Sequence, residues 1–152
     1  MGTYAYNKNN GGIDMTRSEA RKNALELLFE REFRQDETNE EIFATSCESR
    51  EIENDPYIKA AFFGVCENIE AIDEEINKHA KGWKANRLSR VSRSILRLCI
   101  YEMMYEKDIP LRVSINEGIE LAKLYEDEKA RPFINGVLNS VKNSLGGDTD
   151  GK

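Results

Sequence analysis

Apolar residues recur at intervals of three and four along most of this chain, as they do on the buried face of an α-helix. Five or six helices are expected from this spacing, over about residues 16–34, 39–49, 56–79 and 88–105, near Ser114, and near Phe133. No stretch alternates apolar and polar residues as a half-buried β-strand does, and no segment repeats. The pattern predicts an all-α protein.

Three of these helices begin with a recognisable signal. Thr16 and Asp55 stand where a side chain can cap the first backbone N–H groups, and Pro56 suits a first helical turn. Ser114 and Glu117 fit a capping box, in which each side chain accepts a hydrogen bond from the other residue's backbone. We therefore expect the fifth helix to start near Ser114.

At 152 residues, the chain has the length of one domain with a single core. We expect this domain to span residues 16–145, with residues 1–15 as a disordered leader or a cloning remnant. Gly146–Gly147 is the expected stop of the last helix, followed by a disordered tail over residues 146–152. No run approaches the ~20 apolar residues of a membrane span, and the N-terminus lacks the apolar segment of a signal peptide.

Three segments of the second half carry a family resemblance. They read, in order, RLSRVSRSILRLCIYEMMYEKDIP, SINEGIELAK and PFINGVLNSV. Over residues 16–145 the chain resembles the NusB family of bacterial transcription antitermination factors. The resemblance implies a compact helical bundle of the NusB type, with about six to seven helices.

The resemblance also implies a cytoplasmic RNA-binding adaptor. Such a protein would pair with NusE, a small-subunit ribosomal protein, and bind a short boxA-like single-stranded segment of nascent RNA. The complex would help RNA polymerase read through terminators, notably in ribosomal RNA operons. Specificity would then belong to the pair of proteins.

Charge is distributed unevenly along the chain. Residues 1–76 hold 8 basic and 18 acidic residues, whereas residues 77–152 hold 14 basic and 10 acidic ones. The net charge of −6 argues against nonspecific nucleic-acid binding by the whole surface. A local basic patch remains compatible with it.

The densest basic stretch runs from Lys78 to Arg97 and contains no acid. On a helix, Arg90, Arg93 and Arg97 fall on one side, opposite an apolar face. For Arg90 and Arg93 we expect contact with an anionic partner such as RNA. Arg97 is as readily explained by an internal ion pair with Glu102 or Glu117, as part of a solvated face.

A second basic group opens the first helix and consists of Arg17, Arg21 and Lys22. The resemblance implies that this end of the helix contacts RNA phosphates. The run is thin, because Ser18 and Glu19 occupy places where the family often carries Arg. Each lost phosphate contact would lower the affinity and its salt dependence.

A third group, Lys129, Arg131 and Phe133, lies at the start of the last helix. Two cations beside an aromatic ring and an open helix N-terminus could combine phosphate contact with base stacking. The alternative for Phe133 is core packing, as the first member of a buried stripe. That stripe would consist of Phe133, Val137, Leu138 and Val141.

For protein contacts, the resemblance points to Phe29 and Ser92, which match positions near the family's NusE-binding surface. Phe29 is equally suited to the core. An alternative function is a helical interaction module or homodimer of the same fold that does not bind specific RNA. A further one is the accessory domain of a ribosomal RNA cytosine methyltransferase, but a complete enzyme is not expected because no Rossmann-like region follows.

Enzymatic chemistry finds little support in the residues. One His has no Ser or Cys partner at a recognisable spacing, and no phosphate-binding glycine loop is present. The three cysteines are widely spaced, which supports neither a zinc site nor a disulfide framework. We expect no catalysis, metal or cofactor, with Cys66 and Cys99 as reduced core residues and Trp83 as a cover over the end of the 56–79 helix.

Overall fold

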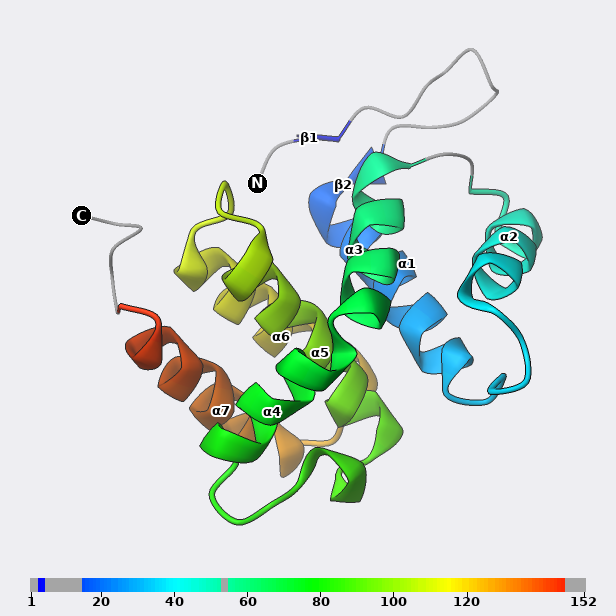
Figure 1. The fold of residues 1–152 in the computed structure, drawn as a ribbon. Coiled ribbons are helices and arrows are strands. Elements are labelled where there is room, and N and C mark those ends of the chain that lie inside the picture. Colours follow the sequence, from blue (N-terminus) through cyan, green and yellow to red (C-terminus); the bar gives the residue numbers. More distant parts are fainter. Residues whose placement is uncertain (1–2, 5–14, 53–54, 147–152) are drawn as a thin grey trace. The chain divides into compact units, whose positions relative to one another are not determined.

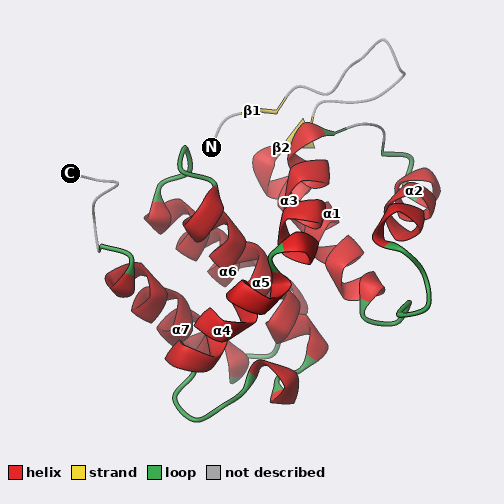
Figure 2. Cartoon of the chain, viewed as in Figure 1, coloured by secondary structure: helices red, strands yellow, loops and turns green. Residues whose placement is uncertain are grey.

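The computed structural model describes residues 3–4, 15–52 and 55–146, and the predicted leader and tail fall mostly outside these ranges. The described helices are α1 (Arg17–Arg31), α2 (Asn39–Ser49), α3 (Pro56–Glu67), α4 (Ile69–His79), α5 (Arg90–Tyr105), α6 (Leu111–Tyr125) and α7 (Ala130–Ser144). A 3₁₀ turn, η2 (Ala85–Arg87), precedes α5. The predicted all-α fold is confirmed (Figure 2). No helix in the described part of the chain is long and apolar enough to cross a membrane.

One short pair of strands was not expected from the sequence. β1 (Thr3–Tyr4) pairs antiparallel with β2 (Met15–Thr16), immediately before α1. Each strand has two residues, which is too short for an alternating pattern to show in the sequence.

The chain forms two compact units, Met1–Cys66 (the N-terminal unit) and Glu67–Lys152 (the C-terminal unit). In the N-terminal unit, α1 and α2 each begin with a capping box, Thr16 with Glu19 and Thr38 with Glu41. The predicted cap at Asp55 is confirmed, because its Oδ1 accepts a 2.9 Å hydrogen bond from Ile58 N. These caps satisfy N–H groups that a helix start leaves unpaired.

Aromatic packing joins α2 to α3 in this unit. The ring centroid of Phe43 lies 5.6 Å from that of Phe62 and 5.1 Å from that of Phe63. Phe62 is fully buried, as are Leu27 of α1 and Ile42 of α2. Burial of such side chains stabilises each by roughly 1.5–3 kcal/mol.

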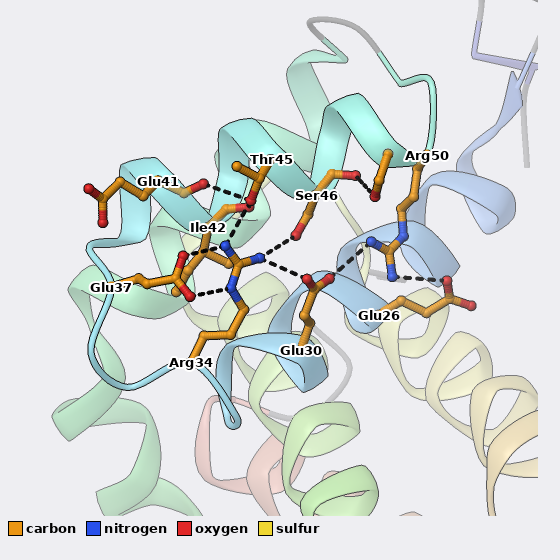
Figure 3. A network of polar contacts seen from close by, with 10 residues as sticks. Glu26, Glu30, Arg34, Glu37, Glu41, Ile42, Thr45, Ser46 and Arg50 are labelled. Atoms are coloured by element: carbon orange, nitrogen blue, oxygen red, sulfur yellow. Dashed lines mark hydrogen bonds and ion pairs between the residues drawn. The ribbon is translucent and has the colours of Figure 1, made fainter.

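A polar network fastens the end of α1 to α2 (Figure 3). Arg34 Nη1 donates to Glu30 at 2.8 Å and to the Ser46 hydroxyl at 3.3 Å, and the same guanidinium pairs with Glu37. Arg50 Nη1 lies 3.1 Å from Glu30. Burial raises the pKa of Glu30, but hydrogen bonds from Ser46, Arg50 and Arg34 outweigh it and leave that pKa below its ordinary value.

The prediction of a single long helix over residues 56–79 is wrong. α3 ends at Glu67 and α4 begins at Ile69, with Asn68 between them at φ −116° and ψ 23°. Ile69 continues the apolar spacing of Val65, so periodicity could not reveal the break. Asn disfavours helix interiors because its side chain competes for backbone hydrogen bonds. Asn68 was therefore a local signal for the break.

In the C-terminal unit, α5 packs against α4, α6 and α7 (Figure 1). It buries most of its length, including Ile95, Leu96, Leu98 and Ile100, each with no exposed surface. Gly118 lets α6 approach its neighbours closely. A Cβ at this position would lie 2.8 Å from Leu138 Cδ1 and 2.9 Å from Cys99 Sγ.

The predicted start of α6 at Ser114 is also wrong. The helix begins at Leu111, directly after Pro110. Ser114 lies inside the helix, and its hydroxyl donates to Glu102 Oε1 at 2.7 Å, with both residues buried. Ser114 therefore binds a buried carboxylate of α5 rather than capping its own helix.

Candidate nucleic-acid interface

The start of α1 carries the cations Arg17, Arg21 and Lys22. The Arg17 guanidinium carbon lies 4.7 Å from the centroid of the Tyr57 ring, and that of Arg21 lies 5.6 Å from it. Arg21 is only 3% exposed, whereas Lys22 is exposed. Cation–π contact thus holds the two arginines over Tyr57, and Lys22 faces solvent.

At the start of α5, Arg90 and Arg93 have different surroundings. Arg93 Nη1 donates to the backbone carbonyls of Ala85 and Leu88, at 3.0 Å each. Arg93 therefore braces the η2 turn against α5. Arg90, the first residue of the helix, is exposed.

Arg97 forms an internal ion pair, which was one of the two interpretations of this residue. The partner in the structure, Asp73, was not suggested by the sequence. Arg97 Nε and Nη2 donate to the two carboxylate oxygens of Asp73 on α4, at 2.9 and 2.8 Å. The residue thus acts in packing α4 against α5.

Ser92 is buried, and its hydroxyl donates to Glu126 Oε2 at 2.6 Å. The same oxygen accepts from Ser89 at 2.7 Å, and Ser89 caps α5 through a 3.1 Å bond from Ser92 N. Glu126 ends α6, so these bonds place the α6–α7 connection beside the first turn of α5. The buried Ser92 hydroxyl therefore holds the α6–α7 connection against the start of α5.

At the start of α7 one backbone N–H is bonded within the chain, although the N-cap residue Lys129 makes no side-chain cap. Asp127 Oδ1 accepts a 3.1 Å hydrogen bond from Ala130 N, the first residue of the helix. Lys129 is exposed and Arg131 is half-buried. Two cationic side chains therefore flank this helix start.

Phe133 does not belong to the core stripe of α7. Ile134 is fully buried beside Val137, Leu138 and Val141, which corrects the predicted stripe by one residue at its first position. Phe133 is half-buried and lines a cavity of about 590 Å³ in the C-terminal unit. The interpretation of Phe133 as a core anchor is therefore wrong.

Phe29 is half-buried on the C-terminal half of α1. Its ring packs edge-on against Phe33, with centroids 5.1 Å apart, and Phe33 is 58% exposed. An aromatic pair with one exposed ring offers apolar surface to a protein partner. Phe33 was not recognised from the sequence, although it lies four residues after Phe29.

Sequence reasoning also missed His79 and Ser140, which lie 61 residues apart. His79 Nδ1 is 2.7 Å from Ser140 Oγ, and Trp83, next to them in the same cavity lining, is 54% exposed. Trp83 therefore covers less of the end of α4 than predicted. No group of three metal-binding side chains occurs in the described residues, and the three cysteines are buried thiols.

The comparisons with known proteins agree with one another. The sequence model of the NusB family matches residues 18–143. The transcription antitermination protein NusB of Bacillus pumilus is 44% identical over 131 residues, which cover 86% of this chain and 98% of that protein. The protein of the same name from Bacillus subtilis is 43% identical with the same coverage.

Solved structures show the same similarity. NusB of T. maritima has a TM-score of 0.78 and 34% identity, and the match covers 90% of this chain and 95% of that one. A chain in a crystal structure of the antitermination factors NusB and NusE with double-stranded RNA has a TM-score of 0.76 and 32% identity. That match covers 84% of this chain and 96% of the other.

Proposed function

The chain belongs to the NusB family, and from that premise we propose that it is a transcription antitermination factor. In this role it binds boxA-like RNA together with NusE and helps RNA polymerase read through terminators, notably in ribosomal RNA operons. The observation that carries the proposal is the 44% identity that spans 98% of a NusB relative. A similar chain in complex with NusE and double-stranded RNA supports the choice of partners.

For the RNA contacts we propose that some cations bind phosphates directly and that others act indirectly. Lys22, Arg90 and Lys129 are exposed and would contact phosphates directly. Arg17 would present the edge of a guanidinium group already oriented by Tyr57, and Arg21, which is only 3% exposed, would act indirectly by holding the Tyr57 ring. Further contacts would come from Arg131 and from the half-buried ring of Phe133, and Arg93 would hold the η2 turn in place.

For NusE we propose contact with the aromatic pair Phe29 and Phe33. Exposed aromatic rings supply a large share of binding energy at protein interfaces. Ser92 would contribute indirectly, because its hydroxyl is bonded to Glu126. A homodimer through the same aromatic surface, without specific RNA binding, is the competing account.

Neither catalysis nor a resident metal is part of the proposal. Asp73 and Glu126 serve as structural partners, the first of Arg97 and the second of Ser92. A cytoplasmic location follows from the proposed role, since transcription takes place there in bacteria.

A binding assay tests this function. Fluorescence anisotropy of a boxA-like RNA and of a scrambled RNA is measured at several salt concentrations, with and without NusE. We expect selective binding that strengthens several-fold with NusE. Equal, weak binding of both RNAs with no effect of NusE would contradict the proposal.

Single variants then test the residues. Lys22→Ala, Arg90→Ala and Lys129→Ala should each weaken binding and lower the slope of log affinity against log salt by about 1. Lys107→Ala is the matched control, because Lys107 is also exposed but follows the opposite end of α5. An equal effect of Lys107→Ala would show that only overall charge matters.

A further inference from the structure

The cavity beside Phe133 is more than a gap in the packing of the C-terminal unit. With a volume of about 590 Å³, it is formed by the end of α4, the turn that follows, and residues of α7. A volume in this range suits a small planar ligand. Residues from two separate parts of the sequence build it, His79–Trp83 and Pro132–Asn143.

The lining combines aromatic and cationic side chains. Trp83 and Phe133 supply the rings and Lys81 a positive charge, and none of the described lining residues is acidic. The lining thus carries a positive charge although the net charge of the chain is −6. Aromatic faces with a nearby cation are the elements by which proteins hold the bases of single-stranded RNA.

The turn that presents Trp83 has a specific backbone. Lys81 adopts φ 49°, which is uncommon for a residue with a side chain, and Gly82 follows at φ 94°. Trp83 N then bonds to Ala80 O at 3.2 Å, which closes the turn. The indole remains 54% exposed, so a closed turn holds an aromatic ring at the cavity's edge.

Gly136 opens the wall of the cavity on α7. A Cβ there would meet nothing within 4 Å, so helix packing does not require the glycine. Glycine inside a helix costs roughly 0.5–1 kcal/mol relative to alanine. Packing requires a glycine at Gly118 but not at Gly136. This contrast indicates that the missing side chain of Gly136 leaves room in the cavity.

A polar wall completes the cavity. Ser140 and His79 are hydrogen-bonded at 2.7 Å, and His79 Nε2 lies 3.3 Å from Glu75 Oε1, so both groups are held in place. Asn139 and Asn143 add amides to the same lining. Hydroxyl and amide groups can both donate to and accept from the edge of a nucleobase.

We propose that this cavity holds one unstacked nucleobase of the bound RNA strand, with Trp83 as its stacking surface. The inference rests on the proposed function and names a contact residue that it does not include. Phe133 and Arg131 connect the cavity to the cationic start of α7, so a strand whose phosphates lie on Lys129 has a short path to the cavity.

Trp83 is the single tryptophan of the chain, so its fluorescence reports directly on the cavity. Titration with boxA-like RNA, in the presence of NusE, should quench the emission as a base stacks on the indole. A series of RNAs with one abasic nucleotide each should identify a single position whose loss abolishes quenching. The same titration of Trp83→Phe measures any change in emission that comes from NusE, and this change is subtracted.

Affinity provides the second measurement. Trp83→Ala should weaken RNA binding at least fivefold, and Trp83→Phe should restore most of it because a ring is retained. Gly136→Leu should weaken binding by filling the cavity without touching Trp83, and circular dichroism checks that each variant is folded. Selective RNA binding with unchanged Trp83 emission and a parent-like affinity of Trp83→Ala would overturn the inference and leave the proposed function intact.

Two further outcomes are informative. If free nucleoside monophosphates quench Trp83 as strongly as the RNA does, and no abasic position matters, the cavity holds a free nucleotide and the inference is wrong. If no selective RNA binding is found at all, the proposed function fails together with the inference.

Discussion

Arg97 of α5 donates two parallel hydrogen bonds to Asp73 of α4, at 2.9 and 2.8 Å. The exposed fractions of the two side chains are 13% and 27%, so the pair is largely removed from water. Two-point pairing between a guanidinium and a carboxylate is stronger and more directional than a single ion pair. A residue from the most basic stretch of the chain thus stabilises the fold.

Removing one partner of this pair should destabilise the C-terminal unit. Asp73→Ala is expected to lower the free energy of unfolding by about 1–3 kcal/mol, because Arg97 loses both of its hydrogen bonds to Asp73. Urea unfolding followed by circular dichroism measures this. Lys123→Ala is the control: it breaks the exposed pair with Glu120, and should change stability by less than about 0.5 kcal/mol. Equal effects would contradict the structural role of Arg97.

Two helix glycines should respond in opposite directions to the same substitution. Gly118→Ala should lower the free energy of unfolding by about 1–3 kcal/mol, because the new methyl group overlaps Leu138 and Cys99. Gly136→Ala should raise it by roughly 0.5–1 kcal/mol, because its Cβ meets nothing and alanine favours the helix. Thermal unfolding of both variants under one condition is sufficient. A stabilised Gly118→Ala variant would show that α6 is not packed as described.

The Glu30 carboxylate should make the α1–α2 connection sensitive to acid. Its pKa in the folded chain is below its ordinary value, because hydrogen bonds from Ser46, Arg50 and Arg34 outweigh the effect of burial. The resulting stabilisation is complete above the ordinary pKa of a glutamate and is lost as the pH falls through the lowered value.

Glu30→Gln should therefore be less stable than the parent at pH 7, and the difference should shrink toward pH 3. Urea unfolding at several pH values measures it. Glu48→Gln, which removes an exposed carboxylate of α2, is the control and should follow the parent curve. A Glu30→Gln difference that stayed constant with pH would count against the network.

The Cys47 thiol should react slowly in the folded protein. Burial raises its pKa, and the Asp55 charge adds to that effect against the opposing charge of Arg50. A raised pKa leaves less thiolate at pH 8, and the thiolate is the reactive form. Iodoacetamide labelling followed by mass spectrometry should show slow modification in buffer and fast modification in urea. Equal rates would mean that Cys47 is not buried.

The sequence predicts local features of this fold well. The caps at Thr16 and Asp55 follow from interactions over three residues, and both occur in the structure. Ser114 fits the same local rule, yet the helix starts earlier, directly after Pro110, and Glu102 offers the Ser114 hydroxyl a buried partner. A tertiary contact overrides a local preference there.

The candidate site is predictable only in part, because its geometry depends on pairs that are distant in sequence. The sequence identifies Arg93 as a cation, but not that the carbonyls of Ala85 and Leu88 occupy it. Likewise, the cavity appears only when α7 brings Ser140 within 2.7 Å of His79. Composition shows which groups are present, and the fold decides which of them face a partner.

Readthrough of a terminator tests the central claim most directly. Purified protein is added to a bacterial transcription extract depleted of its own NusB, with a template that carries boxA upstream of a terminator. The account predicts that a larger fraction of transcripts passes the terminator, and that this gain is lost when boxA is scrambled. Unchanged readthrough on the boxA template, with RNA polymerase and NusE active in the same extract, would contradict an antitermination role.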